Sequence, residues 1–329
     1  MAILISLLVT LVLVAVPILG VAAGAEYVLG VVLPYLAFLV FVVGFILRVV
    51  RWASSPVPFH ITLTGGQQRS LSWIKGSKLD NPSTTLGVVG RMALEVLCFR
   101  SLFRNVKTEL HPEGKLSYRW EKWLWLFGLA LHWSLLIILI RHLRFFTEPV
   151  PFLVGWLESL DGLFRFGYQA FYITDLLIVL ALTFLFLRRV VVARLKYISL
   201  SADYFPLFLL GGIATTGILM KYVSKVDIAS IKELALGFAT FRPVVPEGIG
   251  TIFYIHLFLV CVLMAYFPFS KLMHMGGIFL SPTRNLANNS RAVRHVNPWN
   301  YPVDVHTYEE YEDEFREKMV AAGIPVEKG

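Results

Sequence analysis

A long apolar stretch of the chain indicates the fold class. Residues 122–146 read KWLWLFGLALHWSLLIILIRHLRFF, and a bilayer core requires about 20 mostly apolar residues in a helix. The stretch therefore predicts a membrane-spanning helix. It also contains His132 and His142, and an ionisable side chain in hydrocarbon is costly enough to indicate a functional site.

Five further segments have the length and apolarity of a span, namely residues 2–24, 27–47, 170–187, 203–221 and 250–273. The 329-residue chain is 57% hydrophobic and 16% charged, with a mean hydropathy of +0.67, whereas a soluble domain has about 25% charged residues. This composition excludes a single water-soluble globule and predicts an all-α integral membrane protein with six transmembrane helices. Residues 22–25 resemble a signal-peptide cleavage region, but no Lys or Arg precedes the apolar run, so we expect the first helix to be retained.

The basic residues predict the orientation in the membrane. Between Arg51 and Lys122, eleven Lys or Arg residues face five carboxylates, whereas loops 147–169 and 222–249 together hold four basic residues against six acids. By the positive-inside rule, the basic loop and both termini are expected in the cytoplasm, which places the chain in the cytoplasmic membrane as a multi-pass protein. The net charge of +8 is then explained by topology and by contact with membrane lipid, and no nucleic-acid partner is expected.

Four regions follow from this pattern. They are two N-terminal transmembrane helices (1–50), a cytoplasmic loop with an amphipathic helix (51–121), a four-helix bundle (122–274) and a cytoplasmic tail (275–329). In the loop, apolar residues from Val89 to Val106 recur at helical spacing with charged residues between them, which predicts a helix lying on the membrane or under a partner. In the tail, residues 307–322 carry six carboxylates and an apolar stripe. They predict a short acidic helix that either docks on a partner or frays in solvent.

Histidines of the third and sixth helices form two predicted pairs. His132 and His142 are ten residues apart, about 15 Å along a helix, and His256 and His274 are eighteen apart, about 27 Å. The two helices run in opposite directions, so His142 should meet His256 near the outer surface and His132 should meet His274 near the inner one. A haem iron can take one axial nitrogen from each side of the porphyrin, so two such pairs predict two b-type haems.

The two gaps are unequal, and a bend at Pro268 explains how both pairs could form. Proline removes a backbone donor and breaks a helix, so that His274 can fold back or the helix can tilt. Gly128, one turn before His132, either leaves room for a macrocycle or packs against a neighbouring helix. The remaining histidines are expected to be solvated; they are His60, His111, His295 and His306.

Only two cysteines occur, Cys98 and Cys261. They exclude a disulfide framework, a four-thiolate cluster and a C-x-x-C-H haem attachment, so any cofactor must be held by other side chains. Both cysteines are expected to pack as small apolar residues.

The histidine spacing and the string PFSKLMH at residues 268–274 resemble the dihaem cytochrome b gamma subunit of respiratory nitrate reductase. The strings PFHITLTGG (58–66) and GGIFLSPTRN (276–285), with the additional N-terminal helix, resemble the DsrM family, the membrane cytochromes b of the Dsr (DsrMKJOP) complexes of sulfur-metabolising prokaryotes. That family is also similar to the membrane subunit of heterodisulfide reductase. The resemblance implies a cytoplasmic iron–sulfur partner like the catalytic heterodisulfide reductase chain (DsrK-like), alongside other Dsr membrane complex subunits.

A dihaem unit without a flavin, molybdenum or cluster motif can only relay electrons, so its substrate is expected to be a membrane quinol such as menaquinol. We expect quinol oxidation, the activity of a menaquinol dehydrogenase subunit, beside the outer haem held by His142 and His256. Electrons would pass to the inner haem held by His132 and His274. Quinol-site candidates open the fourth helix: Tyr168, Gln169, Tyr172 and Asp175.

Arg141 and Arg144 lie near the outer end, where the positive-inside pattern does not favour cations. They either bind haem propionates, which a guanidinium fork suits, or extend to the interface. The nitrate reductase family has a lysine in its quinol site, and no matching lysine occurs at the start of the fourth helix.

Two other functions compete with electron transfer. Intramembrane histidines also line transporters that relay protons or bind metal ions, although this chain shows no internal repeat of the kind common in transporters. The chain could instead be a passive membrane anchor for cytoplasmic partners. Haem content distinguishes these alternatives, because only the cytochrome would be red.

Overall fold

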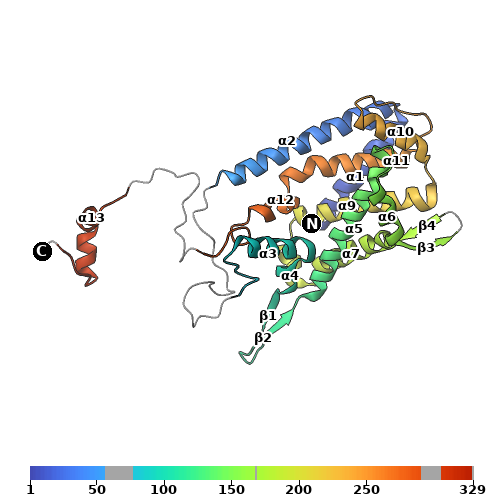
Figure 1. Cartoon of the computed structure of the whole chain (residues 1–329). Helices are drawn as coiled ribbons and strands as arrows, with labels where there is room; N and C mark the ends of the chain where they lie inside the picture. The colour runs from blue at the N-terminus through green and yellow to red at the C-terminus, as the bar shows by residue number, and fades with distance from the viewer. Residues whose placement is uncertain (56–76, 167–168, 290–304, 328–329) are drawn as a thin grey trace.

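Long helices run back and forth between two ends of the molecule (Figure 1). The structure is a computed structural model that describes residues 1–55, 77–166, 169–289 and 305–327. The predicted spans correspond to α1 (Ala2–Ala22), η1 (Val28–Val32) with α2 (Leu33–Ala53), α5 (Lys122–Phe146), α7 (Ile173–Val191), α9 (Ser201–Leu219) with η2 (Met220–Ser224), and α11 (Thr251–Tyr266) with η3 (Phe267–Phe269). The prediction of an all-α membrane fold is confirmed.

Five of these helices, within the described residues, are long and apolar enough to cross a bilayer; α7 is the exception. It is apolar in its middle but carries Asp175 in its first turn and Arg188 and Arg189 in its last. Acidic residues near a helix N-terminus and basic residues near the C-terminus match the helix dipole. The helix packs between α5 and α9, so its charges lie at the ends of the bundle.

The connecting elements gather at two ends of the bundle (Figure 1). We call one the basic end; it holds α3 (Thr85–Cys98), α4 (Arg100–Phe103), η4 (Lys271–Met273), α12 (His274–Gly277), η5 (Ile278–Leu280), α8 (Ala193–Ile198) and the antiparallel hairpin of β1 (Val106–Leu110) and β2 (Leu116–Trp120). The other, the opposite end, holds α6 (Phe152–Asp161), α10 (Ile228–Ala239) and the hairpin of β3 (Gly162–Phe166) and β4 (Gln169–Tyr172). The two ends of the bundle are therefore built from different connecting elements.

The N-terminal helices share a core with the C-terminal ones. α11 packs on α1, α2 and α9, and α5 packs on α7 and α10. One buried cluster joins Leu29 and Val31 to Leu234 of α10 and Tyr254 of α11, and a second joins Leu131 of α5 to helices α7 and α9. Apart from His256, α11 is apolar around nearly its whole circumference, as is typical of a membrane-spanning helix.

The segment predicted as one amphipathic helix is divided in the structure. Phe99 adopts a left-handed conformation with φ of 51°, which ends α3, and Val106 begins a strand instead of a further helical turn. The covered face of α3 is also the charged one, because Arg91 and Glu95 are buried while Val89 is 59% exposed. Both buried charges have hydrogen-bond partners nearby, which offset part of the cost of burial. Arg91 donates to the Asp80 carbonyl, and Glu95 accepts from the backbone and hydroxyl of Ser101.

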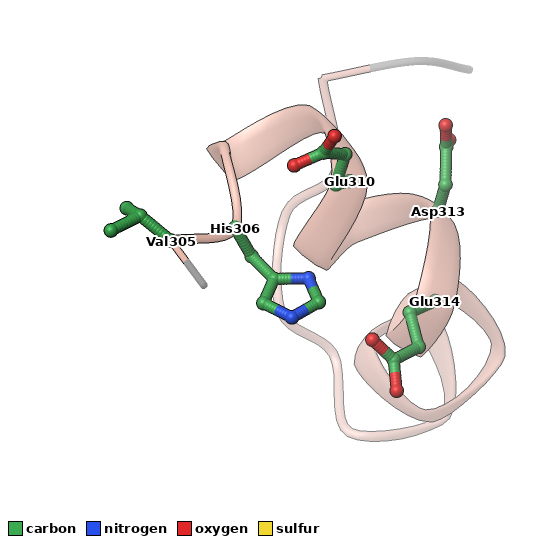
Figure 2. Close-up of a pocket in the computed structure, with 5 residues that line it drawn as sticks. All are labelled: Val305, His306, Glu310, Asp313 and Glu314. Carbon is green, nitrogen blue, oxygen red and sulfur yellow. The ribbon is translucent and has the colours of Figure 1, made fainter. Parts of the chain in front are cut away.

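The predicted acidic helix in the tail is present as α13 (Tyr308–Ala321). Thr307 and Glu310 form a capping box at its start, which satisfies two backbone donors reciprocally. Figure 2 shows the hollow beside it, where His306 lies near Glu310 and Glu314. Among the described residues, no group of three or more His, Cys, Asp or Glu side chains is arranged to hold a metal ion.

Candidate functional site

Two histidine rings face each other toward the opposite end of the bundle. The ring centres of His142 on α5 and His256 on α11 are 6.4 Å apart, and the ring planes differ by only 9°. An imidazole nitrogen binds a metal at about 2 Å, so one ion between two rings, with each ring centre roughly 1 Å behind its nitrogen, needs centres about 6 Å apart. The spacing of this pair fits one metal ion held between the rings.

A second pair of rings meets toward the basic end. The ring centres of His132 on α5 and His274 at the start of α12 are 5.8 Å apart, with planes at 76°. Helix α11 ends at Tyr266, Pro268 lies in the short turn η3, and Ser270 is extended with φ of −115° and ψ of 176°. This change of direction, rather than a tilt of one continuous helix, is how His274 reaches His132.

All four rings have the same hydrogen-bonding arrangement. Nδ1 of His132 contacts the Gly128 carbonyl at 2.7 Å, and Nδ1 of His142 contacts the Ile138 carbonyl at 2.7 Å. In the second histidine of each pair, Nδ1 of His256 contacts the Thr216 hydroxyl at 2.9 Å, and Nδ1 of His274 contacts the Lys271 carbonyl at 2.9 Å.

For His132, His142 and His274 the partner is a carbonyl oxygen, which can only accept, so Nδ1 carries the proton and Nε2 the lone pair. The Thr216 hydroxyl also contacts the Gly212 carbonyl at 2.8 Å; when it donates there, it accepts from Nδ1 of His256, and this ring takes the same tautomer. Within the described residues, no hydrogen bond engages an Nε2 atom of the four rings. Metal-bound histidines characteristically donate their other ring N–H in this way. The donor set therefore fits two metal-centred groups, each held by two imidazoles.

The backbone leaves room for such a group. Helices α5 and α11 form no extensive packing with each other in the described part of the chain, although their histidine rings meet. A Cβ added at Gly217 on α9 would lie 3.3 Å from Cε1 of His256, closer than most side-chain contacts. Gly217 thus lets the imidazole ring approach the backbone of α9, beside its Thr216 partner.

The corner between α3 and α4 lies against the basic-end pair. The ring of Phe99 meets that of His132 at 4.9 Å, edge to face. Trp133 Nε1 donates to the Leu97 carbonyl at 3.1 Å, which ties the corner to α5. A Cβ at Gly128 would meet only Leu102, at an ordinary 3.6 Å.

The two arginines near His142 are paired with carboxylates. Arg141 donates to Asp161 and, at 3.1 Å, to the Thr174 hydroxyl, and the Arg141 side chain is only 11% exposed. Arg144 bonds Glu158 of α6 at 2.6 Å and is 44% exposed. These contacts give both guanidinium groups partners on α6, an element that the sequence analysis did not foresee.

A compact polar cluster lies beside Arg141 at the opposite end. Asp175 accepts hydrogen bonds from Lys221 Nζ at 2.9 Å and from the Tyr222 hydroxyl at 2.6 Å, and Arg141 lies 3.6 Å from its other oxygen. The Tyr172 ring lies between the two cations, 3.8 Å from the Arg141 guanidinium carbon and 3.5 Å from Lys221 Nζ. The Tyr172 hydroxyl, like any phenol, keeps its proton at neutral pH and can donate a hydrogen bond.

The structure brings together only part of the predicted quinol-site residues. Tyr172 and Asp175 belong to the polar cluster. Gln169 lies in β4, paired with Phe166, and Tyr168 lies outside the described residues. Lys221 and Tyr222 were missed, because a lysine was sought only at the start of the fourth helix. The available signal was a lysine at the end of the fifth span, on the side that the positive-inside rule keeps poor in cations.

The chain is similar to a known protein family and to two archaeal proteins. The family described as nitrate reductase gamma subunit matches residues 87–295 of the chain. The chain is 45% identical over 285 residues to the "Hdr-like menaquinol oxidoreductase cytochrome b-like subunit" of Archaeoglobus fulgidus, which covers 84% of this chain and 85% of the relative. Its identity to the protein of the same description in Archaeoglobus profundus is 43% over 274 residues, covering 81% of each.

Proposed function

Because the chain belongs to the nitrate reductase gamma subunit family, we propose that it is a membrane cytochrome b that relays electrons between a quinol and a partner at the basic end. The observation that carries this proposal is the two histidine pairs on oppositely directed segments, each ring with Nδ1 hydrogen-bonded and with no hydrogen bond to Nε2 from the described residues. The relatives are described as menaquinol oxidoreductase subunits, which supports menaquinol as the quinol.

In this proposal each histidine pair holds one b-type haem. His142 and His256 ligate the outer haem, and His132 and His274 ligate the inner one. Each haem iron, when bound, accepts and donates one electron at a time. The chain contributes the two ligands, their fixed tautomers and a separation of about 15 Å along α5. Of the two arginines first considered for haem propionates, Arg144 has the more accessible guanidinium, because Arg141 is committed to Asp161 and Thr174.

The polar cluster is the proposed quinol site. We assign the Asp175 carboxylate as the acceptor for a quinol hydroxyl and the Tyr172 hydroxyl as the donor to the second quinol oxygen. Lys221 and Tyr222 hold Asp175 in position through their hydrogen bonds. Oxidation of one quinol releases two electrons and two protons, and the location of the cluster at the opposite end would release those protons outside.

The basic end is the proposed exit for electrons. By the positive-inside rule this end faces the cytoplasm, with both termini on the same side. The expected partner there is an iron–sulfur subunit resembling the catalytic heterodisulfide reductase chain, a proposal supported by the "Hdr-like" description of the relatives. We further propose, from the Dsr-like sequence strings, that the electrons serve dissimilatory sulfur metabolism.

Ligand substitutions test the haem assignment. The purified chain should contain about two b-type haems, since each pair supplies two axial nitrogens. His142→Ala and His256→Ala should each remove the same spectroscopic haem, and His132→Ala and His274→Ala should each remove the other. Loss that groups His132 with His142 would contradict the pairing, and a colourless folded protein would favour a transporter or an anchor.

Variants of the polar cluster test the quinol site separately. Asp175→Asn and Lys221→Met should lower quinol-dependent haem reduction by about a hundredfold or more, the usual size of a lost proton-transfer contribution, while dithionite still reduces both haems. Lys225→Met is the matched control, because Lys225 is exposed at the end of η2. Equal reduction rates in all three variants would place the quinol site elsewhere and leave the haem assignment intact.

A further inference from the structure

The hairpin of β1 and β2 has one uncovered apolar face. Its register pairs Val106 with Trp120, Thr108 with Tyr118 and Leu110 with Leu116. Alternate residues of a strand point to the same side, so these six side chains share one face. Five of them are large and apolar, and their exposed fractions run from 43% for Val106 to 73% for Leu110.

The other face of the same hairpin is polar. It carries Lys107, Glu109, Ser117 and Arg119, and Lys107 forms an ion pair with Glu109. Strict alternation of apolar and polar residues is the pattern of a sheet that has water on one side and an apolar phase on the other. The hairpin is therefore built to be covered on the face of Leu110 and Tyr118.

The protein itself does not supply that cover within the described residues. The hairpin projects from the basic end (Figure 1), and no described helix packs extensively on it. An isolated two-stranded hairpin is marginally stable in water. A contiguous apolar surface of this kind marks contact with a protein or with a membrane.

The neighbouring residues identify the membrane as the occupant. Trp120 is separated by one residue from Lys122, the first residue of the membrane-spanning helix α5, and Lys122 Nζ lies 3.9 Å from the Trp120 ring centre. Trp123, in the first turn of α5, is 67% exposed, so the apolar face of the hairpin begins where the lipid-facing surface of α5 begins. Tryptophan and tyrosine with nearby lysine are enriched where a protein crosses the membrane–water interface.

We propose that the β1–β2 hairpin lies in the interfacial layer of the membrane, with the face of Val106, Leu110 and Tyr118 toward the lipid acyl chains and the face of Lys107 and Arg119 toward water. The hairpin thus anchors the chain between the α3–α4 corner and α5 to the bilayer surface. This inference does not depend on the haem or quinol assignments.

Spin labels on the two faces test the proposal in the full chain, with its cofactors, in lipid nanodiscs. The background is Cys98→Ser, since Cys98 is exposed and Cys261 is buried. Leu110→Cys and Tyr118→Cys report the apolar face, and Glu109→Cys and Arg119→Cys are matched controls one residue away. The ratio of collisions with oxygen, which is concentrated in lipid, to collisions with a water-soluble nickel chelate should be several-fold higher for the first two.

Equal ratios on both faces would overturn the proposal in favour of a hairpin free in water. Low collision rates with both reagents at residues 110 and 118 would overturn it in favour of a protein cover. Should Leu110→Cys fail to fold, Thr108→Cys reports the same face with a smaller change. Brominated lipid gives an independent readout, because it should quench the fluorescence of Trp120. The quenched part of the tryptophan fluorescence should therefore be smaller in Trp120→Phe than in the wild type.

Discussion

Gly217 is the position where one added methyl group would reach a candidate ligand. A Cβ there lies 3.3 Å from Cε1 of His256, whereas a Cβ at Gly211 on the same helix meets nothing within 4 Å. Gly217→Val should therefore displace the His256 ring and lower the content of the outer haem, and Gly211→Val should leave it unchanged. Haem per chain and the spectrum of the reduced protein measure the effect. Equal haem content in the two variants would show that the ring has room to move.

The polar cluster shows at residue scale how function depends on contacts between distant residues. Asp175 and Lys221 are 46 positions apart in the chain and bond at 2.9 Å. Each alone is an ordinary charged residue at the end of a helix. Only their contact, with Tyr172 between Lys221 and Arg141, forms the polar cluster that we propose as the quinol site.

At the scale of elements, the end of α11 controls the position of His274. Pro268 prevents the helix from continuing, since it lacks a backbone N–H, and Ser270 then redirects the chain. Pro268→Ala should let α11 extend and carry His274 away from His132, which lowers the content of the inner haem selectively. Pro206→Ala, a proline inside α9, is the control and should keep both haems. Unchanged inner haem in Pro268→Ala would mean that Ser270 alone makes the bend.

The α3–α4 corner is expected to lose stability in acid. Burial by itself raises the pKa of Asp80, but hydrogen bonds from Arg104, Arg100 and Ser77 outweigh it and lower the pKa from 3.8 to about 2. A carboxyl with a lowered pKa stabilises the fold fully above pH ~4, and this contribution is lost as the pH falls toward 2. The protection factors of amide hydrogen exchange over residues 78–105, which correct for the intrinsic pH dependence of exchange, should therefore fall between those pH values. Asp80→Asn should exchange faster at neutral pH and lack this acid dependence.

At the scale of the whole molecule, the N-terminal helices support the histidine-bearing core. Helices α1 and α2 both pack on α11, which carries His256, and Ser6 of α1 donates to the Ser201 carbonyl of α9 at 3.0 Å. Deleting residues 2–55 removes two spans. Because this number is even, the remaining helices keep their orientation across the membrane. This deletion should lower the melting temperature and release the outer haem, because one side of α11 becomes uncovered.

Removal of residues 305–329 is the matching control for that deletion. This segment contains α13 and no predicted ligand, so both haems should remain. If the N-terminal deletion kept both haems and the wild-type melting temperature, α1 and α2 would be accessory to the bundle.

Hydropathy and residue spacing alone predicted the membrane class, the six helices and the four histidines that lie in or beside two of those helices. Hydropathy is a local property, because each span must satisfy its own backbone hydrogen bonds and place apolar side chains in lipid. Pro268 likewise predicted the break before His274 from local chemistry alone. These predictions needed no knowledge of which helix lies beside which.

The contacts between side chains became visible in the three-dimensional arrangement of the helices and could not be read from the sequence. That arrangement paired Arg141 with Asp161, brought Lys221 to Asp175 and buried the charged face of α3 instead of its apolar one. In the bilayer, lipid covers apolar side chains as well as protein does, so an apolar stripe does not reveal which face of a helix is buried. Contacts between polar groups depend on how the helices are positioned relative to one another. The spacing of residues along one helix gives no information about that position.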